Sequence, residues 1–293
     1  MNGVVVLDKP SGWTSHDAVN KLRRLADTTK VGHLGTLDPL ATGVLPLVIG
    51  RATRLAQYVA PGRKVYDATI RFGFATDSYD SDGEPLEPPQ PYHLNRHAVE
   101  EWLKILIGRI LQTPPPISAK KIGGIPAYKL ARKKVDVVLP PVEVEIFSID
   151  ILELGEHSLQ IRVNCGPGTY VRSIAHELGQ RAGCGAHLTA LRRLLSSGFA
   201  IERAFTLEQL AALKEAGRFD TAMIPAADLI PEWPSETVDA LTEQQIRQGR
   251  DFRLSPFRGL QTARYVKAIS AEGELIAIGE AKMPLVYHPM LVL

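Results

Sequence analysis

Polar and apolar residues alternate over Tyr66–Phe72. Positions 66, 68, 70 and 72 are apolar and the positions between them are polar, which is the period of a half-buried β-strand. Apolar and alternating runs also predict strands over Val4–Leu7, Val142–Leu154 and Ser158–Cys165. Because strands and helices follow one another without a regular βαβ repeat, the pattern favours an α+β fold over a doubly wound one.

Apolar residues at helical spacing predict the helices between these strands. Thr14 or Ser15 can cap a first helix, and Asn95 can cap another. The segment Arg51–Val59 predicts a further short helix. A helix that opens at Thr169 is expected to end at Gly183, because glycine readily adopts the left-handed conformation that terminates helices.

The segment Pro225–Pro234 is rich in proline and contains acidic residues, and it predicts a domain boundary. We expect a large domain over residues 1–225, with an insertion at about 112–140, and a small domain over residues 226–293. In the small domain, Tyr265–Ser270 and Glu274–Gly279 are predicted to be strands.

Composition excludes several classes of protein. The formal net charge is +2 over 293 residues, so any nucleic-acid-binding surface must be local. The two cysteines, Cys165 and Cys184, are too few for a disulfide framework or a cysteine-rich zinc site. No apolar run approaches the roughly 20 residues that a membrane-spanning helix needs. We therefore expect a cytoplasmic protein.

The segment from Gly32 to Leu45 is the strongest candidate for chemistry. It places one carboxylate, Asp38, among glycines and apolar residues and directly before Pro39, which favours an extended turn. Gly35 and Gly43, like Gly32, allow tight backbone geometry and close approach of a substrate. A carboxylate held in this way suits nucleophilic or general-base work, although a turn aspartate that caps local amides would have the same local sequence.

Five other segments, in addition to the Asp38 motif, resemble the motifs of one protein family and follow one another in that family's order. They are Gly3–Thr14, Lys64–Tyr66, Thr76–Gly83, Gln112–Arg132 and Gly168–Arg172. Together with the Asp38 motif, they resemble the bacterial TruB-type tRNA pseudouridine-55 synthases over roughly residues 3–210. The resemblance implies a pseudouridine-synthase core, with a central mixed, mostly antiparallel sheet and flanking helices, followed by a small β-rich PUA-like domain.

The resemblance also implies an activity: isomerisation of uridine to pseudouridine at position 55 in the T loop of tRNA, on a flipped-out uridine. No cofactor or metal is expected, and the sequence has no Walker loop, dinucleotide-binding motif or metal-ligand cluster. By resemblance, Asp38 is the essential catalytic residue, Arg172 is its ionic partner, and Tyr66 lies against the uracil. Three routes remain open, in which Asp38 attacks the ribose, attacks the base, or removes a ribose proton.

Four further residues match substrate-binding positions of the family. His33 matches a histidine that takes part in base flipping, Asp80 matches an acidic residue of the same region, and Tyr170 and Leu191 match positions that line the pocket. Without the resemblance, each has an ordinary interpretation. His33 would be a turn histidine, Asp80 one of several solvated loop acids, and the two others packing residues.

The segment Lys120–Lys134 supplies the local positive charge that the net charge conceals. It includes Lys120, Lys121, Lys129 and Arg132, and it contains no acidic residue. In the family this insertion grips the T arm of tRNA, although a solvated charged loop would have the same composition.

The expected partner is tRNA, through its T arm and T loop. We expect a monomer that needs no obligate protein partner and no guide RNA, and that binds no membrane. Two alternatives remain. One is the guide-RNA-dependent relative, which shares the catalytic motif, and the other is an RNA chaperone that binds tRNA without chemistry.

Overall fold

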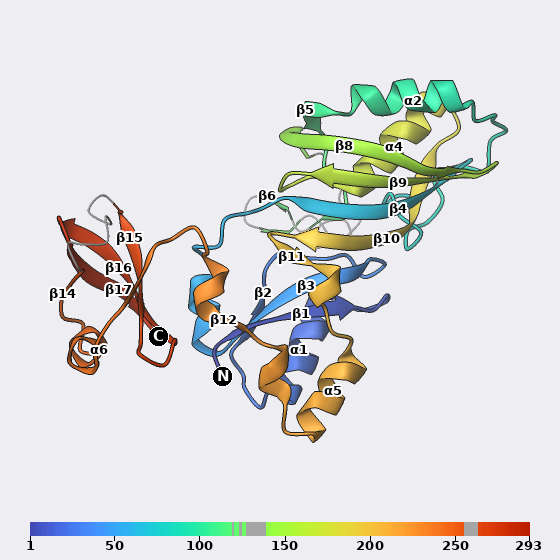
Figure 1. Ribbon diagram of the computed structural model, residues 1–293. Coiled ribbons are helices and arrows are strands. Elements are labelled where there is room, and N and C mark those ends of the chain that lie inside the picture. The colour runs from blue at the N-terminus through green and yellow to red at the C-terminus, as the bar shows by residue number, and fades with distance from the viewer. Residues whose placement is uncertain (119, 123–124, 127–138, 255–262) are drawn as a thin grey trace.

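The computed structural model describes residues 1–118, 120–122, 125–126, 139–254 and 263–293. A ten-stranded sheet forms the body of the molecule (Figure 1), in the order β12–β1–β3–β10–β4–β9–β8–β5, with β2 added to β3 and β11 to β10. Its strands are β1 (Gly3–Lys9), β2 (Val31–His33), β3 (Thr42–Ile49), β4 (Lys64–Phe72), β5 (Gly108–Gln112), β8 (Val142–Leu154), β9 (Ser158–Cys165), β10 (Ala186–Ser196), β11 (Phe199–Ala200) and β12 (Ile224–Pro225).

The sheet is mixed and mostly antiparallel, as predicted. Among the described strand pairs of this sheet, β3 and β10 run parallel and the rest run antiparallel. The predicted bounds of β8 and β9 are confirmed to the residue. Along β4, Tyr66, Ala68, Ile70 and Phe72 are buried, as the alternating pattern requires.

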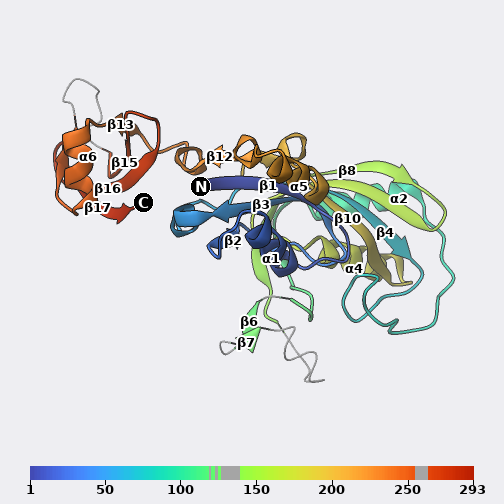
Figure 2. The ribbon, with the colours of Figure 1, turned by 90° about the horizontal axis from the view of Figure 1, so that it is seen from below.

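The α-helices of the described residues are α1 (Ser15–Leu25), α2 (Arg96–Ile105), α4 (Val171–Ala182), α5 (Leu207–Glu215) and α6 (Ala240–Arg247). The first four lie against the large sheet, whereas α6 packs on strands near the C-terminus. Thr14 caps α1 and Asn95 caps α2. Helix α4 begins two residues later than predicted and ends at Gly183, whose φ of 71° is left-handed. Figures 1 and 2 show α1 and α5 beside β1, and α2 and α4 beside the β4–β9–β8 part of the sheet.

A short helix is present where Arg51–Val59 predicted one, but it is shorter than predicted. The structure has a 3₁₀-helix, η1 (Gly50–Leu55), followed by turns. Ala52 and Leu55 are both fully buried, and their three-residue spacing matches the three residues per turn of a 3₁₀-helix. Further short 3₁₀-helices are η2 (Ile201–Arg203), η3 (Phe219–Ala222) and η4 (Ala226–Leu229).

A separate five-stranded sheet follows near the C-terminus and forms the small β-rich domain. Its order is β13–β15–β16–β17–β14, with bounds Ser235–Thr237, Tyr265–Ile269, Leu275–Met283, Val286–Val292 and Phe252–Arg253. Val4 and Val6 of β1 belong to one hydrophobic cluster with Ile278 and Leu291 of this sheet, and Arg54 of η1 donates to the Val292 carbonyl at 2.7 Å. The division at residues 225 and 226 stays a proposal.

The predicted insertion includes a short hairpin, β6 (Lys121–Ile122) and β7 (Ile125–Pro126), which projects away from the large sheet in Figure 2. Among the described residues, no helix is long and apolar enough to cross a membrane.

Candidate active site

The loop between β2 and β3 carries Asp38, and buried side chains hold its backbone on both sides of that residue. The Ser15 hydroxyl accepts a hydrogen bond from the Leu37 N–H at 2.9 Å and donates to the Leu37 carbonyl at 3.1 Å. The Lys9 ammonium, fully buried, donates to the Pro39 carbonyl at 3.3 Å and to the Trp13 carbonyl at 2.6 Å. These hydrogen bonds fix the backbone of the loop and so the position of the Asp38 carboxylate.

Arg193 of β10 supports the same loop from the other side. Its guanidinium is fully buried and donates to the carbonyls of Val44 at 2.7 Å and Thr36 at 3.2 Å. The backbones of Arg193 and residue 43 also pack closely, which requires glycine at position 43. There φ is 96°, and an added Cβ would lie 2.3 Å from the Arg193 carbonyl oxygen. Gly35 also has a positive φ, of 85°, whereas Gly32 lies within β2 without one.

Burying Lys9 has an electrostatic cost. Desolvation lowers the pKa of its ammonium to about 8, with Asp38 acting in the opposite direction and Arg193 adding to the decrease. The three carbonyl contacts of this lysine, including one to Pro10 at 2.9 Å, compensate part of the lost hydration.

Arg172 joins the Asp38 loop to a second carboxylate. Its Nε lies 2.9 Å from Oδ2 of Asp38, and its Nη1 lies 3.4 Å from Oδ2 of Asp80. Nη1 also donates to the carbonyls of Ser78 at 2.9 Å and Ile117 at 3.0 Å. The arginine side chain is 5% exposed, so the alternative of a surface arginine is wrong. One buried cation thus ties three segments of the chain together.

Asp80 is buried, unlike its neighbours Asp77 and Asp82, which are exposed. Burial raises the pKa of the Asp80 carboxyl, while the Ser78 hydroxyl and the Arg172 guanidinium act to lower it. The interpretation as a solvated loop acid is therefore wrong for Asp80, although it holds for the two flanking acids.

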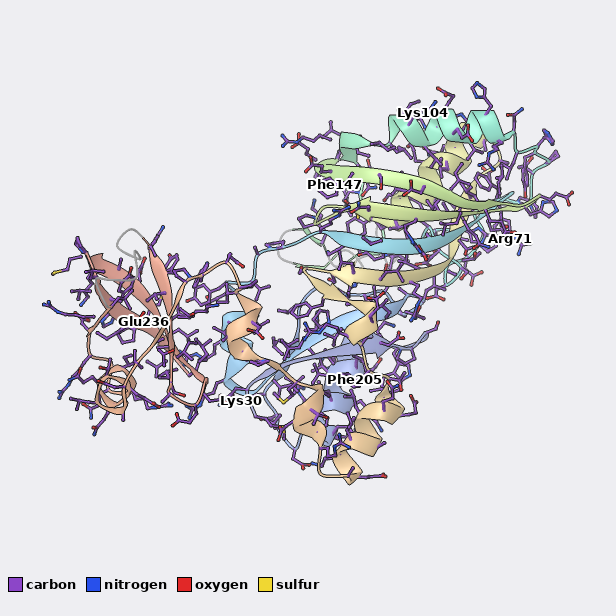
Figure 3. The ribbon with its side chains drawn as sticks, in the orientation of Figure 1. Lys30, Arg71, Lys104, Phe147, Phe205 and Glu236 are labelled. Atoms are coloured by element: carbon purple, nitrogen blue, oxygen red, sulfur yellow. The ribbon has the colours of Figure 1, made fainter. Side chains whose placement is uncertain are left out.

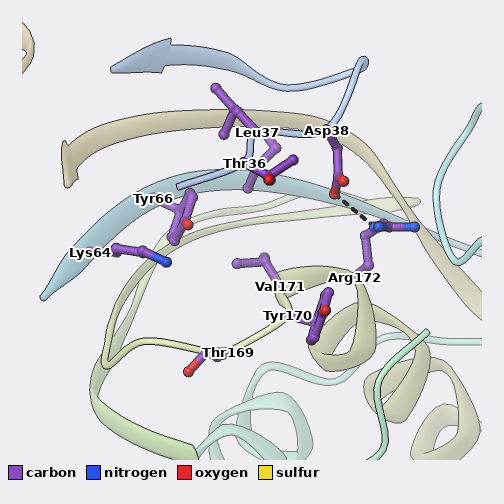
Figure 4. A pocket seen from close by; sticks show the side chains of 11 residues that line it. Thr36, Leu37, Asp38, Lys64, Tyr66, Thr169, Tyr170, Val171 and Arg172 are labelled. Carbon is purple, nitrogen blue, oxygen red and sulfur yellow. Dashed lines mark ion pairs between the residues drawn. The ribbon is translucent and has the colours of Figure 1, made fainter. Parts of the chain in front are cut away.

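A cavity of about 220 Å³ opens beside the ion pair (Figure 4). It is lined by Asp38, Tyr66, Tyr170, Arg172 and Leu191, together with Thr36, Leu37, Lys64, Gly168, Thr169 and Val171. The first five are predicted site residues, and they come from four separate parts of the chain, because Tyr170 and Arg172 are two residues apart. The structure brings them together around one space.

The two tyrosines of the cavity are held in different ways. Tyr66 is 7% exposed, and burial raises the pKa of its hydroxyl while the neighbouring Arg193 acts against the rise. Tyr170 precedes α4, and its N–H donates to Gln112 Oε1 at 2.8 Å while its carbonyl accepts from Gln112 Nε2 at 3.1 Å. Burial raises the pKa of the Tyr170 hydroxyl as well.

The other predicted residues lie outside the cavity wall. His33 is half-buried at the end of β2, where the Asp38 loop begins, and burial lowers its pKa. Lys120 is partly exposed next to the β6–β7 hairpin, and Lys121 is the first residue of β6. Lys129 and Arg132 lie outside the described residues.

Sequence reasoning missed Lys9, Ser15 and Arg193 as supports of the loop, and Lys64 as a residue of the cavity. A weak signal existed for Lys9, a lysine at the end of an apolar strand, and for Lys64, two residues before Tyr66 on an alternating strand. Nothing local marks Arg193, because its partners lie about 150 residues earlier in the chain.

In the part of the chain that the structure describes, no three His, Cys, Asp or Glu side chains are grouped as a metal site would need. The chemistry that the cavity offers is that of a carboxylate, a paired guanidinium, a buried tyrosine and a second cation.

Comparison with known proteins identifies the family. A model of the N-terminal domain of the TruB family pseudouridylate synthases matches residues 23–171, and a model of the C-terminal domain of tRNA pseudouridylate synthase B matches residues 172–228. The chain belongs to the TruB family of pseudouridylate synthases. It is therefore an enzyme of the isomerase class. The chain is 52% identical to tRNA pseudouridine synthase B of Solibacter usitatus over 293 residues, which is 100% of both chains.

Further relatives and solved structures agree. The chain is 40% identical to tRNA pseudouridine synthase B of Dechloromonas aromatica, with 96% of this chain and 91% of that one covered. A crystal structure of a Cbf5–Nop10–Gar1 complex contains a chain with a TM-score of 0.69 and 28% identity, covering 97% of this chain and 79% of that one. The predicted fold, a pseudouridine-synthase core followed by a PUA-like β domain, is confirmed.

Proposed function

We propose that this enzyme converts uridine to pseudouridine at position 55 in the T loop of tRNA, acting alone and without a cofactor. Membership of the family supports the reaction class, and the names of the full-length relatives support tRNA as the substrate. The observation that carries the choice of residues is the 2.9 Å ion pair between Asp38 and Arg172 at the wall of a cavity that also holds Tyr66.

The reaction breaks the bond between ribose C1′ and uracil N1 and forms a bond between C1′ and C5. The base turns between the two steps, N1 gains a proton, and C5 loses one. Atoms and electrons balance within the nucleotide, so neither an oxidant nor an energy source is needed. What the reaction needs is an ionised group at the ribose–base junction, a surface for the base, and shelter from water.

The cavity residues match these needs. The Arg172 guanidinium lies 2.9 Å from the Asp38 carboxylate, and the hydrogen bonds of the Asp38 loop fix the position of the pair. Tyr66 presents an aromatic ring to the same space, where stacking would hold an extruded uracil. Asp38 then acts as nucleophile on the ribose or the base, or as a base toward a ribose proton.

Access of the uridine to this cavity requires base flipping, for which we propose His33. It lies at the end of β2, next to the loop that carries Asp38. The insertion, with Lys120, Lys121, Lys129 and Arg132, is proposed to bind the phosphates of the T arm.

The test uses purified protein and an unmodified tRNA transcript, with no added guide RNA, nucleotide or metal. Carbodiimide mapping of pseudouridine should show one modified position, the T-loop uridine 55. A transcript with cytidine at that position should give no product. Modification elsewhere in the tRNA would contradict the assigned position.

The alternative of a guide-dependent enzyme is worth testing, because the chain is similar in fold to a chain in structures of Cbf5-containing complexes. Product from the transcript alone would exclude a need for guide RNA. Binding without product would instead indicate a guide-dependent enzyme or a chaperone.

A further inference from the structure

The cavity holds a cation that the proposed mechanism does not use. Lys64 is the first residue of β4 and stands two residues before Tyr66, so both side chains lie on one face of the strand. Figure 4 shows the Lys64 ammonium on the Tyr66 side of the cavity, away from the pair of Asp38 and Arg172. The two cations of the cavity therefore stand at different ends of it.

The surroundings of the two cations differ sharply. Arg172 faces the carboxylates of Asp38 and Asp80, whereas Lys64 makes no hydrogen bond or ion pair with any residue that the structure describes. Lys64 is half-buried, and desolvation lowers the pKa of its ammonium, with Arg193 adding to the decrease. A partly desolvated cation that has no ion-pair partner is stabilised when a negative charge comes next to it.

Negative charge arises in this cavity during the proposed reaction. When the bond between C1′ and N1 breaks, its electron pair stays on the base and spreads over N1 and the carbonyl oxygens O2 and O4. This holds whether Asp38 attacks the ribose, attacks the base, or removes a ribose proton. With the ribose at Asp38 and the uracil against Tyr66, the far edge of the base points toward Lys64.

We propose that the Lys64 ammonium donates a hydrogen bond to a carbonyl oxygen of the target uracil and stabilises the charge that the base acquires as it leaves the ribose. This inference rests on the proposed function. Lys64 keeps its proton throughout, while N1 gains one and C5 releases one after the new bond between C1′ and C5 has formed. Because the charge is larger in the transition state than in bound uridine, the interaction raises the rate rather than the affinity.

The experiment compares single-turnover rates at saturating tRNA for wild type, Lys64→Met and Lys64→Arg. Loss of one such donor typically lowers rates by roughly 100-fold or more, so we expect a fall of about that size for Lys64→Met, with tRNA affinity within a few fold. Lys64→Arg keeps the charge and should retain most of the rate. The matched control is Lys104→Met on the outer side of α2 (Figure 3), 67% exposed, which should leave the rate unchanged.

A second substrate separates this role from a structural one. In a tRNA with 5-fluorouridine at position 55, the fluorine withdraws electrons and stabilises the departing base. The rate at which the starting nucleoside is consumed should then depend less on Lys64. Chromatography of a nuclease digest measures this rate. The rate lost in Lys64→Met should be several-fold smaller for 5-fluorouridine than for uridine, a difference that a merely misfolded variant would not produce.

Two results would overturn the inference alone, given an active wild-type protein. One is an unchanged saturating rate in Lys64→Met, with weaker binding and a salt slope reduced by about 0.7–0.9, which would assign Lys64 to a phosphate. The other is an equal loss for both nucleosides. A wild-type protein that makes no pseudouridine would instead overturn the proposed function, and this inference with it.

Discussion

Replacing Arg172 with methionine should destabilise the protein strongly, because this arginine compensates a buried carboxylate. The substitution removes donors to the carbonyls of Ser78 and Ile117 and leaves Asp80, whose side chain is 7% exposed, without its cation. Breaking a buried ion pair by removing one partner costs roughly 3–5 kcal/mol. Asp38 adds little to this figure, because its carboxylate is 35% exposed and screened by water.

The loss should depend on pH in a defined direction. Burial raises the folded-state pKa of Asp80 above its unfolded value, so the native state binds the proton more tightly and loses stability as pH rises through that pKa. Without Arg172 the pKa of Asp80 rises further. The destabilisation by Arg172→Met should therefore be larger at about pH 7 than at about pH 5.

Urea unfolding at the two pH values measures this effect. Asp80→Asn in the Arg172→Met background should recover on the order of 0.5–3 kcal/mol at neutral pH, the usual range for directly coupled residues. Arg181→Met removes an exposed pair with Glu177 on the same helix and should cost less than about 1 kcal/mol. A loss for Arg172→Met no larger than that of Arg181→Met, or no recovery from Asp80→Asn, would refute the reasoning.

Two other predictions concern cations outside this pair. Lys9 has a pKa of about 8 against an ordinary 10.5, so the unfolded chain holds the proton longer, and the free energy of unfolding should rise with pH across that window by at most roughly 3 kcal/mol. Urea unfolding of Lys9→Met should lack this rise; an identical pH profile would contradict the burial argument. Charge reversal of Lys120 and Lys121 to glutamate should weaken tRNA binding and lower its salt slope by about 0.7–0.9 for each lost phosphate contact. Filter binding across a salt series measures this, and an unchanged slope would mean that the two lysines only contact solvent.

Local signals predicted the elements that position the site. The alternation along β4 placed Tyr66 on the buried face, and the strands β8 and β9 have the bounds that the sequence indicated. Gly183 ends α4 because glycine tolerates the left-handed backbone there. The helix over Arg51–Val59 was predicted too long, and its sequence does not distinguish the 3₁₀ type from the α type, because two buried residues at three-residue spacing fit both.

The supports of the site were harder to predict. Asp38 and Arg172 were found through motifs, yet nothing in the sequence shows that Arg172 also faces Asp80 or that Arg193 donates to the loop of Asp38. These contacts join residues far apart in the chain, and β10 lies beside β3 only once the sheet has formed. The burial of Asp80 was equally hard to predict. Asp80 and Asp82 have similar neighbours in sequence, and only in the folded protein is one buried and the other exposed.

The most direct test of the central claim is a single-turnover assay of Asp38→Asn on an unmodified tRNA transcript, with tRNA binding measured in parallel. Asparagine keeps the size of the side chain and removes its charge. Asp82→Asn, an exposed acid whose side chain has no hydrogen bond among the described residues, is the matched control. We predict no pseudouridine from Asp38→Asn with tRNA affinity within a few fold of wild type, and normal product from Asp82→Asn. Pseudouridine at the wild-type rate from Asp38→Asn would contradict the account.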